Sequence, residues 1–210
     1  DADVPLDVLA AFARAVGDEL RHTELCVAMA ARFGARPSPS LPMRRPVVEP
    51  STPARRARGL EIVAMQGAIG ETLSCAFLRK GERLAEEPGV KAALRSIRKD
   101  EVMHARQSWE ALGVLVPTLD DGGRASLHAH LRFGLGGVEN NLALPALRQV
   151  EAKERVDPAL ATLGLVPPAE RAHAFYRTIE RRVIPALDEL GLDGKLAWSE
   201  RKRDWAPRPA

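Results

Sequence analysis

Two pentapeptides with the same pattern, Asp-Glu-x-x-His, occupy residues 18–22 and 100–104 of this chain. Each lies within a long stretch whose apolar residues recur at helical spacing. On an α-helix, residues three positions apart share one face, so a Glu and a His at this spacing project into the same small volume. The sequence therefore predicts two long helices that each carry a carboxylate and an imidazole on one face. If these faces meet in the fold, such side chains can hold metal ions between the helices.

The composition favours an all-α fold. Ala, Leu, Arg and Glu are abundant, and aromatic residues make up only 4% of the 210 residues. No stretch alternates polar and apolar residues for long enough to predict a strand. The apolar periodicity, with proline and glycine at its breaks, predicts helices at residues 6–33, 58–86, 90–112, 124–147 and 169–190.

A proline-rich segment divides the first two of these helices. Residues 35–57 contain six prolines and no periodic apolar pattern, which predicts an extended linker. Such a linker is long enough to run the length of a helix as a crossover connection. We expect residues 1–117 to form an antiparallel metal-binding helical bundle, and residues 118–210 to form a C-terminal helical extension that ends in a basic tail.

Charge, cysteine content and hydropathy exclude several classes of protein. The net charge is +3, and the basic residues gather in the linker and near the C-terminus, as in solvated loops, so nucleic acid is not the expected partner. Cys26 and Cys75 lie in apolar helical contexts and are expected to pack in the core, so no disulfide framework is predicted. No apolar run approaches the roughly 20 residues that span a bilayer. We expect a cytoplasmic protein without a membrane partner.

A third carboxylate, Glu71, lies between the two pentapeptides on an apolar part of its helix. A buried carboxylate is unfavourable without a compensating cation, so Glu71 is predicted to be a ligand. The chain reads as a repeated helix pair, and Glu71 precedes Glu101 by the offset that would place the matching carboxylate about eleven residues before Asp1. We therefore expect the first ligand helix of the bundle to be lost, undetermined or removed from this sequence, and with it the matching carboxylate, which would be the sixth protein ligand beside the Glu and His of each pentapeptide and Glu71.

Over residues 5–112 the chain resembles the ferritin-like superfamily of di-iron carboxylate proteins, in particular those of the rubrerythrin and soluble di-iron oxidase kind. That resemblance implies a ferritin-like bundle with two iron ions, or iron and manganese, as cofactor. It also implies that Glu19 and Glu101 bridge the two metals, that His22 and His104 are terminal nitrogen ligands, and that Glu71 is a terminal carboxylate.

The residue before each bridging glutamate also matches the family pattern. In many di-iron oxidases this acid accepts a hydrogen bond from the metal-bound histidine of the opposite half, which fixes the orientation of the imidazole. The resemblance thus pairs Asp18 with His104 and Asp100 with His22. Arg21 completes the family form Asp-Glu-x-Arg-His in the first pentapeptide, whereas the second has methionine at that position.

The function implied by the resemblance is activation of dioxygen or peroxide, foremost by an oxidase or oxygenase acting on a small organic substrate. Two cysteines cannot form the four-cysteine iron site of a rubrerythrin, so an external electron donor would be required. One alternative is a protein that oxidises and handles iron itself. Another is a non-catalytic interaction module with a vestigial metal site. A bundle lacking its first helix would also expose an apolar groove that a partner helix or a second copy could fill.

Other candidate ligands are set aside on their context. Glu170 and His173 repeat the Glu-x-x-His spacing, but they lie in the first turn of a helix and lack the preceding Asp. His128 and His130 point to different helix faces and are expected at the surface or in packing. Glu139 stays open as a substitute for the missing carboxylate, provided that the C-terminal helices cover the site.

Overall fold

The computed structural model describes residues 5–35 and 55–202, and every regular element within them is a helix. The prediction of an all-α chain is therefore confirmed. The expected extended linker and the last residues of the basic tail lie outside the described residues, apart from residues 55–57, which begin a helix rather than end the linker. Within the described part of the chain, no helix combines the length and the apolar character that crossing a bilayer requires.

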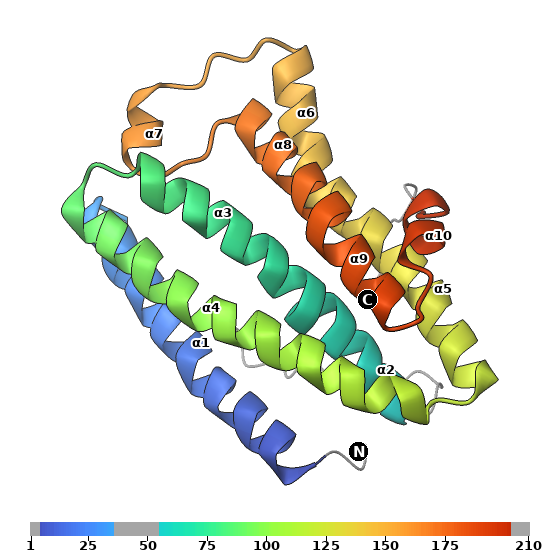
Figure 1. The fold of residues 1–210 in the computed structure, drawn as a ribbon. Helices are drawn as coiled ribbons and strands as arrows, with labels where there is room; N and C mark the ends of the chain where they lie inside the picture. The colour runs from blue at the N-terminus through green and yellow to red at the C-terminus, as the bar shows by residue number, and fades with distance from the viewer. Residues whose placement is uncertain (1–4, 36–54, 203–210) are drawn as a thin grey trace.

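The N-terminal half forms three long rods (Figure 1). Helix α1 spans Leu6–Arg32. The second rod is continuous and consists of α2 (Arg55–Ile62), the π-helical segment η1 (Val63–Gly70) and α3 (Glu71–Leu84). The third rod, α4 (Pro88–Leu115), runs antiparallel to α3, and α1 packs along α4 on its other side.

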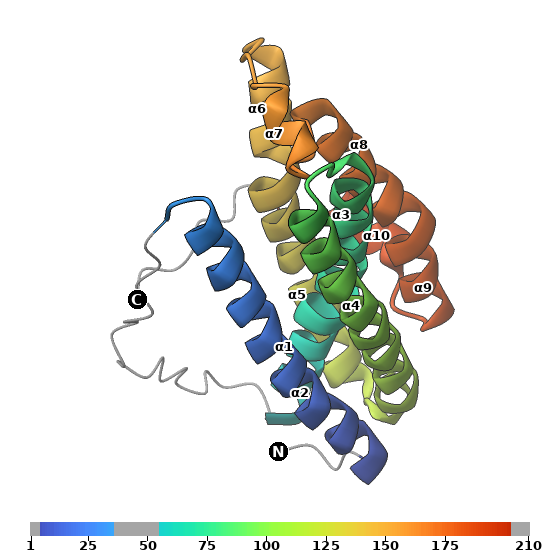
Figure 2. The same ribbon diagram turned by 90° about the vertical axis from the view of Figure 1, so that its left-hand side faces the viewer.

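Two further rods cover the opposite face of the α2–η1–α3 rod (Figures 1 and 2). One consists of α5 (Asp121–Val138), η3 (Glu139–Ala143) and α6 (Leu144–Glu151). The other consists of α8 (Pro168–Thr178), η4 (Ile179–Val183) and α9 (Ile184–Glu189). Two short helices, α7 (Ala159–Thr162) and α10 (Gly194–Ser199), complete this layer.

The π-helical turns η3 and η4 each end two residues before a proline, Pro145 and Pro185. Proline cannot donate the backbone hydrogen bond of its turn, and its ring clashes with the carbonyl four residues earlier. A widened π turn relieves this clash, so both rods continue past their proline instead of ending there. The helix predicted to end at residue 147 therefore continues through Pro145 to Glu151.

Other helix boundaries also differ from the sequence prediction. The turn expected at residues 113–123 is shorter, because α4 continues to Leu115 and is followed by the 3₁₀ turn η2 (Val116–Thr118). Helix α5 then begins at once, since the Asp120 side chain accepts a hydrogen bond from the Gly123 backbone N–H. The sequence analysis did not predict α7 or α10.

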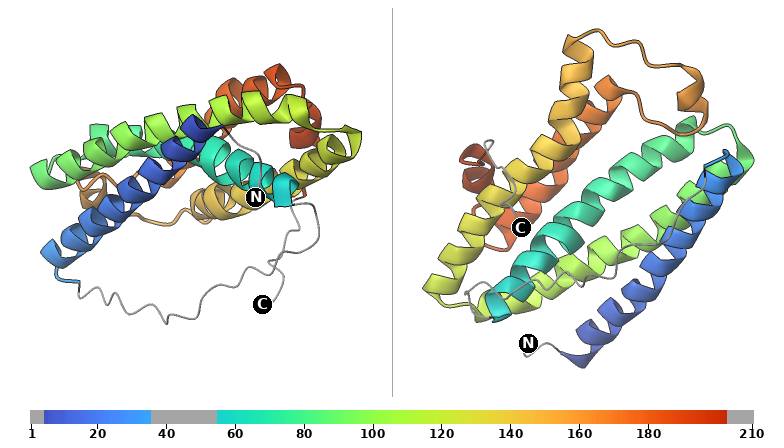
Figure 3. Two further views of the ribbon diagram at one scale, coloured as in Figure 1. Left: turned by 90° about the horizontal axis from the view of Figure 1, so that it is seen from below. Right: turned by 180° about the vertical axis from the view of Figure 1, so that it is seen from behind.

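One hydrophobic core joins the α2–η1–α3 rod, the end of α4 and the two C-terminal rods. Its fully buried side chains include Leu60, Ile69, Leu112, Leu131 and Phe175. Helix α1 adds nothing to this core, because His22 is its only buried residue. Figure 3 shows α1 at the outer edge of the molecule, beside α4.

The apolar side chains of α1 form an exposed stripe. These residues recur three and four positions apart, as in the contact face of a packed helix. The large exposed members are Leu6, Leu9, Val16, Leu20 and Val27, which keep between 40% and 83% of their surface accessible. Helix α1 thus presents a row of exposed apolar side chains on one face.

Candidate metal centre

The candidate centre lies between the middle parts of α1, α4 and the start of α3. Glu19 and His22 project from α1, and Glu101 and His104 project from α4. Glu71 is the first residue after the π-helical segment η1, so its direction depends on how closely η1 approaches α4. Gly67 permits that approach: a Cβ atom added there would lie 2.4 Å from the Ser108 Oγ of α4.

The five side chains that the sequence predicts as ligands are brought together. Glu19, Glu71, Glu101 and His104 each offer a ligand atom, and these atoms all lie within 4.8 Å of one another. The Nδ1 atom of His104 lies 3.0 Å from Glu101 Oε2 and 3.3 Å from Glu19 Oε1. The Nδ1 atom of His22 lies 3.5 Å from Glu19 Oε1 and 3.6 Å from Glu101 Oε1. Both imidazoles therefore turn the same ring nitrogen toward the carboxylates.

The outer nitrogens of the imidazoles are held by the two aspartates, each across the helix pair. His104 Nε2 lies 3.0 Å from Asp18 Oδ2, and His22 Nε2 lies 3.1 Å from Asp100 Oδ2. The expected pairing of each Asp with the His of the opposite pentapeptide is thus confirmed. An ionised carboxylate can only accept, so each Nε2 donates its proton to an aspartate, and each Nδ1 is left facing the inner carboxylates.

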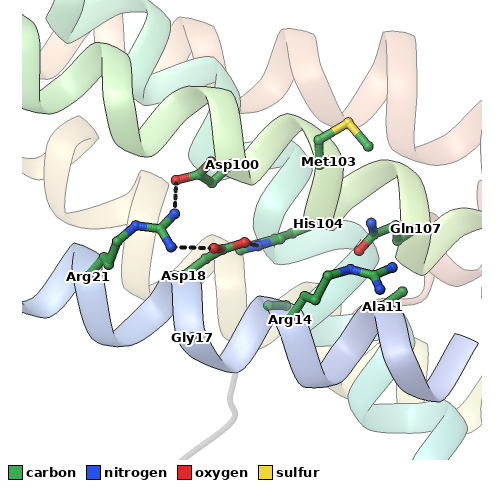
Figure 4. A pocket seen from close by; sticks show the side chains of 10 residues that line it. Ala11, Arg14, Gly17, Asp18, Arg21, Asp100, Met103, His104 and Gln107 are labelled. Carbon is green, nitrogen blue, oxygen red and sulfur yellow. Dashed lines mark hydrogen bonds and ion pairs between the residues drawn. The ribbon is translucent and has the colours of Figure 1, made fainter.

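A single arginine links the two Asp–His pairs (Figure 4). Arg21 Nη1 lies 2.8 Å from Asp18 Oδ1, and Arg21 Nη2 lies 3.1 Å from Asp100 Oδ2. One guanidinium therefore serves both pentapeptides, which explains how the second can have Met103 where the first has arginine. Met103 instead lines a cleft of about 410 Å³ along the α1–α4 seam, next to Asp18.

The electrostatics of the cluster favour a bound cation. Burial, followed by the charges of Glu101 and Glu19, raises the pKa of Glu71 to about 8. Burial and the charge of Glu19 likewise raise the pKa of Glu101. Three carboxylates that repel one another this strongly need protons or metal cations among them to coexist.

The pKa of Asp18 is shifted in the opposite direction. The hydrogen bond with His104, with a further contribution from Arg21, lowers the pKa of Asp18 despite its partial desolvation. Desolvation lowers the pKa of His104, but its hydrogen bonds to Asp18 and Glu101 outweigh this and leave the pKa raised. Asp18 is therefore an ionised partner of His104 and Arg21, whereas the raised pKa values of Glu71 and Glu101 favour the protonated forms of these two carboxyl groups in the metal-free cluster.

His22 provides the test of whether these residues fit a metal ion. Its Nδ1 atom is buried, and it has no hydrogen-bond partner within residues 5–35 and 55–202. A polar nitrogen that is buried without a hydrogen-bond partner destabilises the fold. Coordination of a metal ion by its lone pair would remove this cost. A donor set of carboxylate oxygens and imidazole nitrogens around this atom fits a metal centre.

The two glutamates of the pentapeptides differ in how far the protein shields them from solvent. The side chain of Glu101 is 8% exposed, whereas that of Glu19, its counterpart in the repeat, is 54% exposed. The difference arises because α4 packs between α1 and α3, while α1 has a packed neighbour only along its α4 side among the described elements. The centre is therefore open on the side of Glu19.

A hydrogen bond that was not predicted from the sequence fixes Thr72, the neighbour of Glu71 in the chain. Trp109 Nε1 donates to Thr72 Oγ1 at 3.0 Å, and the Thr72 hydroxyl donates in turn to the carbonyl of Ala68 in η1. Trp109 lies on α4 beyond His104, so this bond ties the residue next to Glu71 to the helix that carries the second pentapeptide. No local spacing in the sequence indicates such a contact between two rods.

Glu139 does not substitute for the missing carboxylate. It is fully buried, and its oxygens accept hydrogen bonds from Arg201 Nε at 2.7 Å and Nη2 at 3.0 Å, and from the Tyr176 hydroxyl at 2.9 Å. The Arg201 guanidinium also lies 3.7 Å from the ring centroid of Trp198. This cluster, which we call the Glu139–Arg201 clamp, fastens the segment after α10 to η3.

The remaining candidates also lie apart from the centre. Glu170 pairs with Lys80, His173 is exposed, and His130 Nδ1 lies 3.3 Å from Glu61 Oε2. Cys75 is half-buried, and burial, with the charges of Glu101 and Glu71, raises the pKa of its thiol to about 11. Cys26 is exposed on α1, so its expected place in the core was wrong.

Comparisons of the chain with protein-family models, with curated proteins and with solved structures gave no match.

Proposed function

We propose that this protein is a ferritin-like di-iron protein, with iron or a pair of iron and manganese ions as cofactor. The ligands would be Glu19, His22, Glu71, Glu101 and His104. The observation that carries the proposal is the crossed pairing of each imidazole with an aspartate of the opposite helix, which aims both Nδ1 lone pairs at one group of carboxylates. The Nδ1 atom of His22, which is buried and has no hydrogen-bond partner among the described residues, would gain a partner in a coordinated ion.

The donor set favours iron and manganese over zinc and copper. Three carboxylates supply hard oxygen donors and two imidazoles supply one nitrogen each, a mixture that suits iron and leaves coordination positions open. Two reduced ions of this kind would supply electrons to dioxygen or peroxide. The chain's own residues would set the spacing of the ions and keep the imidazoles in one tautomer, and Glu71 would hold a proton whenever the cluster lacks positive charge.

The proposed reaction is the oxidation of a small organic substrate, with an external electron donor that returns the centre to its reduced state. The open side beside Glu19 supports this reaction, because dioxygen and a substrate could reach the cluster there without a change in the core. We place the donor among separate proteins or small reductants, since the sequence has only two cysteines and cannot build a rubredoxin-like site.

A partner helix along α1 belongs to the same proposal. Five large apolar side chains are exposed on this helix, at the spacing of a packing face. A helix on this stripe, from a second copy or from another segment, would cover the exposed apolar side chains and could supply a sixth ligand. Sedimentation of the intact protein with and without metal would detect the copy-to-copy form as a doubled mass.

Metal analysis tests the proposal directly. After anaerobic incubation with ferrous iron and desalting, we expect about two irons per chain, as in the ligand set of ferritin-like proteins. Exposure to air should then produce an absorption band that depends on dioxygen. Formation of a mineral with excess iron, rather than stoichiometric oxidation, would assign the site to iron handling instead of substrate oxidation.

Variants assign the ligands. Glu101→Ala and His22→Ala should lose iron, whereas His173→Ala should keep it. His173 is the matched control because it belongs to the third Glu-x-x-His sequence and is exposed on α8. Retention of both irons in the first two variants would refute the assignment, and a metal-free protein of unchanged stability would favour the non-catalytic module.

A further inference from the structure

A second site candidate lies between the last turns of α3 and the first turns of α4, where the two rods meet in their short connection (Figure 1). A hollow of about 370 Å³ opens there, and we call it the basic hollow. Its lining residues are Arg79, Glu82, Arg83, Lys91 and Arg98. Four of these five side chains are cationic, in a chain whose net charge is only +3.

The single carboxylate of the hollow is already used. Glu82 Oε1 accepts from Arg95 Nε at 2.8 Å, and Glu82 Oε2 accepts from Arg98 Nε at 2.7 Å. These two hydrogen bonds lower the pKa of Glu82, so the group is a fixed anion with both oxygens occupied. It therefore has no capacity to neutralise the remaining cations of the basic hollow.

The other three cations have no carboxylate partner in the part of the chain that the structure describes. Arg79 and Arg83 lie four residues apart on α3, and Lys91 faces them from the first turn of α4. Like charges at this helical spacing destabilise a helix, and here two helices bring such charges to one hollow. An anion bound between them would remove this repulsion.

The chemistry of the lining defines the ligand class. Guanidinium groups donate paired hydrogen bonds that match the oxygens of a phosphate, and an ammonium adds a compact charge that phosphate groups also accept. We propose that the basic hollow binds the phosphate group of a small multiply charged anion, held by Arg79, Arg83 and Lys91. Arg98 stays engaged with Glu82 and sets the wall of the hollow.

This inference is independent of the metal centre. Its test is a titration of the full-length protein with inorganic phosphate, pyrophosphate and ADP by calorimetry, at constant ionic strength set with potassium chloride. We expect saturable binding of one anion per chain, tighter for pyrophosphate than for phosphate. If ADP binds more tightly than pyrophosphate, the phosphate belongs to a larger organic molecule; if it does not, the ligand is the free anion.

Paired variants separate a site from general attraction to a basic surface. Arg79→Gln with Arg83→Gln should weaken pyrophosphate binding by about tenfold or more, since each charged hydrogen bond lost contributes at least a factor of this order. The control is Arg177→Gln with Arg181→Gln, which removes two exposed arginines at the same spacing from α8 and η4. Equal loss in both pairs, or no saturable binding to the wild-type protein, would overturn the proposal. Circular dichroism of each variant verifies that the fold is retained.

Discussion

Replacement of Glu71 by glutamine should stabilise the metal-free protein at alkaline pH and at the same time abolish its stabilisation by metal. In the folded chain the pKa of Glu71 is raised from 4.5 to about 8, chiefly by burial and then by the charges of Glu101 and Glu19. Between these two pH values the folded state retains a proton that the unfolded state has lost. The free energy of unfolding must therefore fall as pH rises through this window.

The magnitude follows from the shift. One pKa unit corresponds to about 1.4 kcal/mol, so the full shift sets an upper limit of about 5 kcal/mol. Solvent reaches the cluster beside Glu19 and screens part of the repulsion, so we expect about 2 kcal/mol. Because glutamine resembles the protonated acid in shape and charge, Glu71→Gln should match the wild type near pH 5 and exceed it by this amount above pH 8. For a chain of this size, the difference corresponds to about 4–8 °C in Tm.

Urea unfolding in the presence of a chelator, at pH 5 and pH 8.5, measures both values. Glu24→Gln is the control, since Glu24 is exposed on α1. Addition of Mn²⁺ as an air-stable probe should reverse the order, because Glu71 is a proposed ligand of the ion and glutamine removes its charge. If Glu71→Gln lowers the stability of the metal-free protein equally at both pH values, Glu71 is a structural residue and the electrostatic reasoning fails.

Three further predictions concern the supports of the fold and the centre. Gly67→Ala places a methyl group against Ser108, so it should push η1 away from α4 and weaken Mn²⁺ binding, measured by calorimetry; unchanged affinity would show that the close approach does not position the ligands. Asp18→Asn keeps the shape of the side chain but loses the charge that orients the imidazole of His104, so the Mn²⁺ affinity should fall by about 10- to 100-fold. This loss should be smaller than the loss in a ligand variant such as Glu101→Ala. Arg201→Gln leaves Glu139 buried without its charged partner and should lower the free energy of unfolding by about 3 kcal/mol, as measured in urea; a change within error would mean that the clamp carries no stability.

The parts of this molecule that follow from local sequence were predictable. The long helices carry a sustained apolar period, and the pentapeptides place Glu and His on one face regardless of what surrounds them. The crossed Asp–His pairs followed from the resemblance combined with the repeat. For the helices and for the Glu and His of each pentapeptide, the information lies within a few residues of the feature, whereas the crossed pairs join residues 78 and 86 positions apart and needed the resemblance.

Contacts between distant segments that the resemblance does not cover were not predictable. The Glu139–Arg201 clamp joins residues 62 positions apart, and only the packing of the C-terminal rods brings them together. The same holds for Trp109 with Thr72, and for the exposure of Cys26, whose apolar neighbours in sequence gave it a core context. The π turns depend on a local steric conflict at proline, which apolar periodicity does not indicate, so the helices were predicted to pass through both prolines without a π turn.

The way α1 is attached makes it sensitive to what the centre holds. Its one buried side chain is His22, and Arg21 and Arg32 add ion pairs to Asp100 and Glu87 of the α4 rod and its cap. The contacts that hold α1 against α4 thus involve the same group of side chains that would bind the ions. Little buried apolar surface attaches α1 to the rest of the molecule. Metal binding should therefore be coupled to the stability of α1 in its packed position. The amide protons of α1 should exchange with solvent far more slowly once metal is bound.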